Sequence, residues 1–227
     1  MMNEVPILYE DNHLLVVIKP PNLLSQADRT GDDDLLSILK QYIKEAYQKP
    51  GNVYLGLVHR LDRPVGGIMV FAKTSKAARR LAAQIRSGTF QKGYLAAVWG
   101  HPQELRAGLS HYLLKNRRTN MVSVSSPGVK GAQKARLEYE VVDMTSALSL
   151  VRIQLHTGRS HQIRVQMAAH GHPLFGDQRY GRRTDRREQI ALWAERLAFK
   201  HPTTQEQLQF SEAPPSVRPW DRFKHRA

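Results

Sequence analysis

The chain has 227 residues, of which 41% are hydrophobic, so it can bury a substantial core as one large domain or two small ones. Its 34 Lys and Arg outweigh 20 Asp and Glu, and the resulting net charge of +14 attracts polyanions such as nucleic acid, although membrane-surface binders share such a charge. The absence of cysteine excludes disulfides, thiolate zinc sites and cysteine nucleophiles.

The beginning of the chain does not have the pattern of a secretion signal. Glu4 and Pro6 stand where such a signal needs a basic start followed by an apolar stretch. No later apolar run approaches the length needed to span a membrane. We therefore expect a soluble, cytoplasmic protein.

The first third of the chain predicts strands and helices in alternation. Short apolar runs at residues 7–9 and 14–19 indicate two strands joined by a tight turn, and residues 67–72 indicate a third. Asp34 can cap a helix whose apolar residues recur every three or four positions, and Ser75 can cap a second helix that ends at Gly88.

The rest of the chain predicts mainly antiparallel strands. Residues 94–99 indicate a strand, and alternating polar and apolar residues between 109 and 155 are typical of half-buried strands. Ser160 can cap a helix from residue 161 to about residue 169. Strands are also expected at residues 190–199 and 207–210.

The pattern as a whole predicts one α+β domain, with a mainly antiparallel mixed sheet flanked by helices. No internal repeat or linker interrupts it. We place this domain at residues 1–213 and a basic tail at residues 214–227. The tail can be either a partly ordered terminus or a segment that contacts RNA.

Asp62 is the first candidate for chemistry. It lies in the segment His59-Arg60-Leu61-Asp62-Arg63-Pro64-Val65-Gly66-Gly67, whose proline and glycines prevent a helix. Nearby positive charge keeps a carboxylate ionised, as a nucleophile or base must be. A surface Asp that bridges Arg60 or Arg63 explains the same residues equally well.

A second cluster, Thr157-Gly158-Arg159-Ser160-His161-Gln162-Ile163-Arg164, places cations at the start of a helix, where the helix dipole disfavours them. A phosphate, or a carboxylate from elsewhere in the fold, would reconcile this arrangement. Alternatively, Arg159 and His161 point into solvent. A third segment, Lys92-Gly93-Tyr94, opens a strand with an aromatic ring that either belongs to the core or stacks on an unpaired base.

Taken in this order, the three segments resemble the signature of the RluA-type RNA pseudouridine synthases, and the likeness covers nearly the whole chain. His59-Arg60-Leu61-Asp62, Lys92-x-Tyr94 and Gly158-Arg159-x-His161-Gln162-Ile163-Arg164 match its three motifs. The start of the chain, with Val17-Ile18-Lys19-Pro20, and the segment Gly171 to Asp177 are also similar to the family.

The resemblance implies an isomerase that turns uridine of rRNA or tRNA into pseudouridine, without a cofactor or metal. Asp62, Tyr94 and Arg164 are then the catalytic residues: Asp62 is the essential carboxylate, Arg164 pairs with it, and Tyr94 stacks on the uracil and assists removal of the C5 proton. The residue matching Arg60 fills the space that a flipped-out uridine leaves. The remaining motif residues are expected to bind the RNA or the uridine: His59, Arg60, Leu61, Arg159, His161, Gln162 and Ile163. A monomer suffices for this reaction, and no protein partner is evident.

Two departures from the family pattern leave other functions open. Gly66 replaces a usual serine, and the chain begins at the catalytic domain, without the S4-like RNA-binding domain that many members carry. A non-catalytic RNA-binding or ribosome-assembly protein on the same fold is one alternative. A nucleoside or glycoside hydrolase is another, although such enzymes generally use two carboxylates.

Overall fold

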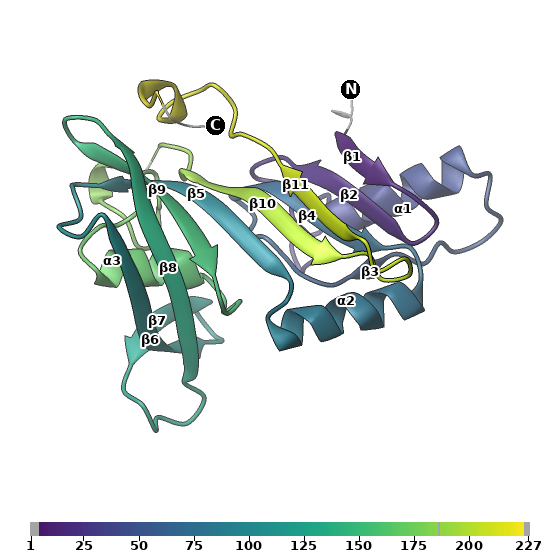
Figure 1. Cartoon of the computed structure of the whole chain (residues 1–227), viewed down its shortest axis with the longest axis horizontal. Helices are drawn as coiled ribbons and strands as arrows, with labels where there is room; N and C mark the ends of the chain where they lie inside the picture. Colours follow the sequence, from purple (N-terminus) through teal and green to yellow (C-terminus); the bar gives the residue numbers. More distant parts are fainter. Residues whose placement is uncertain (1–4, 186, 225–227) are drawn as a thin grey trace. The chain divides into compact units, whose positions relative to one another are not determined.

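The computed structural model of this protein describes residues 5–185 and 187–224. Glu4 and residues 225–227 of the basic tail, which contribute to expectations above, lie outside the described residues. The chain divides into two compact units (Figure 1). The first contains Met1–Gln91 and Arg196–Glu212, and the second contains Lys92–Glu195 and Ala213–Ala227.

The sheet of the first unit is built around two buried strands, β2 and β4. Its strands follow the order β1-β2-β4-β10, with β3 paired to β4 and β11 paired to β10. Strand β2 is rich in branched side chains and β4 carries branched and aromatic ones, and they pair antiparallel from Leu14 opposite Ala72 to Lys19 opposite Gly67. The bounds are β1 (Ile7–Glu10), β2 (Leu14–Lys19), β3 (Gly56–Leu57), β4 (Gly66–Ala72), β10 (Leu192–Lys200) and β11 (Gln207–Ser211). Only the part of β10 from Arg196 onward belongs to the first unit.

Two helices bury apolar stripes in the first unit. Helix α2 (Ser75–Ser87) contacts β3 and β4 (Figure 1). It contributes Ala77 and Leu81 to a core cluster that also holds residues of β2, β4 and β10. Helix α1 (Leu35–Ala46) buries Leu35, Leu39 and Ile43, which recur every four residues along one helical face.

The second unit contains a run of antiparallel strands in the order β5-β9-β8-β6-β7. Helix α3 (Gln162–Ala169) contacts β6 and β7 (Figure 1). A small core cluster joins Val165 of α3 to buried residues of these strands. The strand bounds are β5 (Gln91–Trp99), β6 (Arg106–Asn116), β7 (Met121–Ser125), β8 (Gln133–Met144) and β9 (Leu148–Leu155). Two short 3-10 helices, η1 (Arg183–Asp185) and η2 (Trp220–Arg222), complete the elements described.

The described part of the basic tail is packed. Trp220 and Phe223 are buried, with 4% of each residue exposed. The backbone N–H of Lys224 donates to the Asp143 carboxylate at 2.7 Å, and Arg218 pairs with Glu188 at 3.2 Å. The division into a catalytic domain and a tail at residue 213 stays a prediction.

The structure confirms the α+β class, the mainly antiparallel sheet and most predicted elements. Asp34 caps α1 by accepting a hydrogen bond from the Ser37 N–H, and Gly88 ends α2 in the left-handed conformation. The predicted cap of α2 is one residue off. Thr74 accepts from the Ala77 N–H, and Ser75 is already helical, because two hydroxyl residues compete for the same position.

Within residues 5–185 and 187–224, no helix is both long and apolar enough to cross a membrane.

Candidate active site

Asp62 lies in the loop that leads into β4, as the sequence predicts. The segment from residue 58 to residue 65 has no helical or strand structure, and the Val65 N–H closes a turn by donating to the Asp62 carbonyl at 2.9 Å. Asp62 itself is half-buried, whereas Arg60 is exposed. The loop therefore gives the carboxylate a defined, partly desolvated position.

His59 and Leu61 of this loop are hydrogen-bonded to other segments of the first unit. His59 Nε2 accepts a hydrogen bond from the Val70 N–H of β4 at 3.1 Å. The Ser25 hydroxyl donates to the Leu61 carbonyl at 2.8 Å and accepts from the Leu61 N–H at 3.2 Å. Because the backbone is fixed on both sides of Arg60, and just before Asp62, these two side chains are held on a rigid support.

Arg63, which follows Asp62, also forms hydrogen bonds with the first unit. Its guanidinium binds the Asn22 carbonyl at 3.2 Å and the Asp32 carboxylate at 2.6 Å. Half of the Arg63 and Asp32 side-chain surfaces remains exposed, so this ion pair adds little to stability. Its contribution is to orient the turn.

Lys19 is a fully buried cation at the end of β2, beneath this loop. Its Nζ donates to three carbonyls, those of Pro20 at 3.0 Å, Leu23 at 2.6 Å and Arg63 at 3.0 Å. Burial lowers the pKa of Lys19 from 10.5 to about 7; the negative charge of Asp62 opposes this shift and the positive charge of Arg63 adds to it.

Lys19 gives the protein a predictable dependence of stability on pH. Between about pH 7 and pH 10 the unfolded chain keeps a proton that the folded protein has lost, so the free energy of unfolding rises with pH, by at most about 1.4 kcal/mol per unit. Below about pH 7 Lys19 is protonated in both the folded and the unfolded protein, so the cost of burying its charge lowers the free energy of unfolding by a constant amount. Urea unfolding should therefore show that the free energy of unfolding of the natural protein rises with pH over this range relative to that of Lys19→Met.

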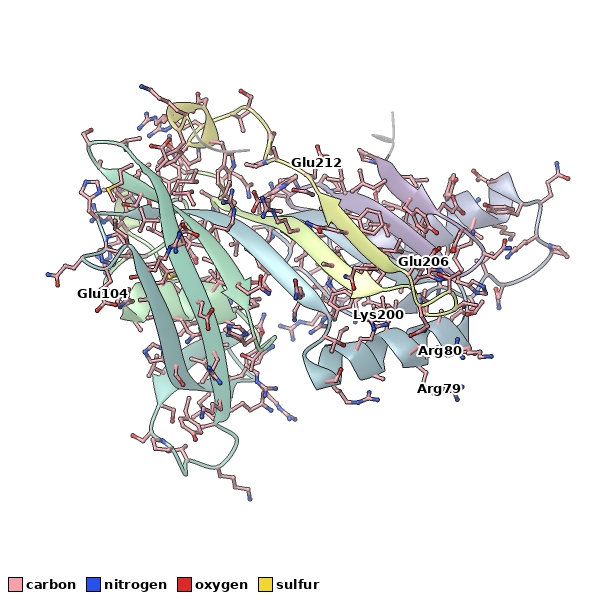
Figure 2. All side chains as sticks on the ribbon, viewed as in Figure 1. Arg79, Arg80, Glu104, Lys200, Glu206 and Glu212 are labelled. Carbon is pink, nitrogen blue, oxygen red and sulfur yellow. The ribbon has the colours of Figure 1, made fainter. Side chains whose placement is uncertain are left out.

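The exposed Lys200 of β10, labelled in Figure 2, supplies the control for this measurement. Lys200→Met removes the same charge from an exposed site, so its difference from the natural protein should not change over the same pH range. A pH-independent effect of Lys19→Met would contradict the assignment.

Helix α3 is buried on all sides and carries polar residues inside. Six consecutive residues from Gln162 to Met167 are buried, including Gln162, Arg164 and Gln166. Buried polar groups require hydrogen-bond partners. Gln166 Nε2 lies 3.3 Å from the Leu109 carbonyl and 3.0 Å from His111 Nδ1. A helix of this kind positions polar groups rather than only filling a core.

Arg164 is held by a carboxylate that the motif analysis did not name. Its Nε and Nη2 donate to the two oxygens of Asp177 at 2.8 and 2.7 Å, and both side chains are almost fully buried. Burial raises the pKa of Asp177, but the Arg164 bonds and charge, with the N–H groups of Arg179 and Tyr180, hold it below its ordinary value. This carboxylate supplies the anion expected near the start of α3.

His161 precedes α3 in the left-handed conformation, with φ of 52°. It is the N-cap residue and makes no side-chain capping bond, so the predicted cap by Ser160 is wrong. The Tyr180 hydroxyl accepts from the Val122 N–H at 2.9 Å and can donate its own proton to His161 Nδ1 at 2.7 Å. The His161 ring is thus held by a tertiary contact with Tyr180. His161 is buried, so it does not simply point into solvent.

Gln162 fixes the turn that contains the Gly-Arg motif. Its Oε1 accepts from the Thr157 hydroxyl at 2.7 Å and from the Arg159 N–H at 3.0 Å, and its Nε2 donates to the Arg136 carbonyl at 3.0 Å. Arg159 is exposed, and its Nε donates to the Lys134 carbonyl at 3.1 Å. Ile163 is buried. The expected contacts of Arg159, Gln162 and Ile163 with RNA stay predictions.

Tyr94 lies on β5 opposite Ile153 of β9, with 7% of the residue exposed. Such burial suits both a core side chain and a stacking platform at a closed pocket, so the role of the ring stays a prediction. Asp62 and its loop belong to the first unit, whereas Tyr94 and Arg164 belong to the second. The pairing of Arg164 with Asp62 also stays a prediction.

Sequence reasoning missed three side chains that hold the site, namely Asp177, Lys19 and Ser25. Two of them lay in segments already recognised as similar to the family, Lys19-Pro20 and the segment ending in Asp177, which was the available signal. No signal pointed to Ser25. Among the described residues, no group of three or more His, Asp or Glu could hold a metal ion.

Comparison with known proteins gives one consistent result. A family model described as RNA pseudouridylate synthase matches residues 13–169. The dual-specificity RNA pseudouridine synthase RluA of Escherichia coli is 36% identical over 205 residues, which cover 86% of this chain and 87% of that protein. The tRNA pseudouridine synthase C of Pasteurella multocida is 34% identical over 224 residues, 89% of this chain and 88% of that protein.

Other relatives are longer than this chain. The ribosomal large subunit pseudouridine synthase C of Vibrio vulnificus is 34% identical over 215 residues, 90% of this chain but only 64% of that protein. Among solved structures, human RNA pseudouridylate synthase domain containing 4 has a TM-score of 0.78 at 22% identity, over 92% of this chain and 88% of that one, which shows the fold. The family model and the relatives show that this chain is a member of the RNA pseudouridylate synthase family, of the RluA type.

Proposed function

We propose that this protein isomerises uridine in a structured rRNA or tRNA to pseudouridine, with Asp62 as its catalytic carboxylate. The observation that carries the proposal is the position of Asp62, half-buried on a loop whose neighbouring residues are fastened by His59, Ser25 and Lys19. A nucleophile or base must be held within a fraction of an ångström of the reacting atom, and such a loop meets that need.

The reaction breaks the bond between ribose C1′ and uracil N1 and forms a bond between C1′ and C5. The proton on C5 leaves and N1 gains one, so the product is an isomer of the substrate. Asp62 can attack C1′ as a nucleophile or remove the C2′ proton to give a glycal. Both routes need the carboxylate ionised.

Further roles follow the family resemblance. Arg164 pairs with Asp62, Tyr94 stacks on the uracil, and Arg60 fills the space left when the uridine is flipped out. The exposure of Arg60 suits this last role. The bidentate grip of Asp177 supports a positioning role for Arg164, because it fixes the plane of the guanidinium before any substrate arrives.

RNA is the partner that the charge of the protein favours. Arg117 and Arg118 after β6, with Lys134 and Arg136 on β8, are exposed basic residues of the second unit. Each phosphate that such residues neutralise raises the dependence of RNA affinity on salt. We place the protein in the cytoplasm and regard a monomer as sufficient for the reaction.

The direct test measures tritium released from RNA labelled at uridine C5, followed by analysis of the nucleosides. We expect tritium release together with pseudouridine. RNA binding without tritium release would favour a non-catalytic assembly protein, for which Gly66 in place of the usual serine is the argument. Release of free uracil would instead indicate a hydrolase.

A further inference from the structure

The cationic side chain of Lys92 lies on the same face of β5 as Tyr94. The two residues are two positions apart on β5, so their side chains project to the same side, with Cα atoms about 7 Å apart. The Lys92 ammonium rests against Gly158, where a Cβ atom would lie only 3.0 Å from Nζ. Lys92 is therefore in contact with the turn that opens the Gly-Arg motif.

A second cation stands beside it. Burial lowers the pKa of Lys92, and the positive charge of Arg159 lowers it further. In residues 5–185 and 187–224, neither side chain forms an ion pair. Two neighbouring cations, one of them half-buried, repel each other unless an anion joins them. The described part of the chain does not supply that anion.

The turn is built before a ligand arrives. Gln162 accepts from the Thr157 hydroxyl and the Arg159 N–H, which fixes the backbone around Gly158. The Arg159 guanidinium is anchored only through Nε, to the Lys134 carbonyl, and within the described residues its Nη groups have no hydrogen-bond partner. The missing side chain at Gly158 leaves room for the Lys92 amine at this point.

We propose that Lys92 and Arg159 bind a backbone phosphate of the RNA, within one nucleotide of the target uridine. The inference rests on the proposed function, in which Tyr94 stacks on the uracil. A phosphate offers oxygens to both a point-charge ammonium and the guanidinium fork. A polyanion is favoured over a small anion because the turn is bonded to the backbone of two further exposed basic residues, Lys134 and Arg136.

Binding of a fluorescein-labelled RNA stem–loop with one loop uridine tests this without turnover. Lys92→Met should weaken binding about ten-fold or more, as for loss of a charge-assisted hydrogen bond. It should also lower the slope of log affinity against log salt by about 0.7 to 0.9. Lys92→Arg should retain the slope. Lys200→Met, which removes an exposed charge from the first unit, is the matched control and should change the slope less.

Neutralising single phosphates identifies the contact. A methylphosphonate placed in turn at each loop position should weaken binding to the natural protein most strongly beside the uridine. At that position it should cost Lys92→Met almost nothing more, because the two changes remove the same interaction. Arg159→Gln, at an exposed position that cannot disturb the core, should show the same non-additivity even where Lys92→Met folds poorly.

The inference is overturned if Lys92→Met, confirmed as folded by its unfolding transition, binds with unchanged affinity and salt slope. It is equally overturned if, at every loop position, a methylphosphonate weakens RNA binding to Lys92→Met and Arg159→Gln by the same factor as it weakens binding to the natural protein. These outcomes are distinct from failure of the proposed function, which would appear as RNA bound by the natural protein without pseudouridine formed.

Discussion

Asp62→Asn should lower kcat for pseudouridine formation by about four orders of magnitude or more, the scale seen when an enzymatic nucleophile is removed. The substitution keeps the size of the side chain but removes its charge, so neither nucleophilic attack nor proton removal is possible. Because the loop is fastened through the backbone of Leu61 and Arg63, the fold and the affinity for RNA should persist. Single-turnover kinetics with labelled RNA, together with a binding assay, measure both.

The matched control is Asp33→Asn, at an exposed carboxylate. It removes one negative charge from the same unit, and kcat should change little. Activity retained in Asp62→Asn, or a loss that merely follows unfolding, would mean that the active carboxylate has been assigned to the wrong residue.

Asp177→Asn should lower the free energy of unfolding by about 3–5 kcal/mol, because it removes the charge of a buried carboxylate that binds the Arg164 guanidinium through two hydrogen bonds. The carboxylate also accepts from the N–H groups of Arg179 and Tyr180, so the segment after it should loosen. Urea unfolding at neutral pH gives the stability. Catalysis should also fall, because the plane of the Arg164 guanidinium is no longer fixed.

Asp32→Asn is the comparison for this change. Asp32 also pairs with an arginine, Arg63, but about half of each side chain is exposed, so the loss should be at most about 1 kcal/mol. Equal losses from the two substitutions would show that burial of the Arg164–Asp177 pair does not matter for stability.

Elements whose signals are local were predictable from the sequence. Asp34 directly precedes the first apolar residue of its helix, and β2 is a run of branched residues, so both were placed correctly. The cap of α3 was not, because the left-handed His161 takes the cap position and its ring bonds Tyr180, which is 19 residues away. Such contacts leave no pattern in the local sequence.

In the site, too, features with a local sequence signal were predictable and features set by tertiary contacts were not. The residue types and spacing around Asp62 indicate a non-helical loop with nearby cations, and that loop is present. The buried partners of the site are not readable in this way. Lys19 ends a strand and would ordinarily be a solvent-exposed lysine, but three carbonyls brought together by the fold bury it completely. Asp177 likewise meets Arg164 only through the tertiary structure.

The first unit is not continuous in the chain. Leu197 and Phe199, which are buried in its core, come after the whole of β5 to α3. During synthesis on a ribosome, the N-terminal 91 residues must therefore wait, with part of their apolar surface uncovered, until more than a hundred further residues have emerged. For the same reason no single cut of the chain releases either unit whole. A fragment that holds one unit would have to join its two separated segments with a linker.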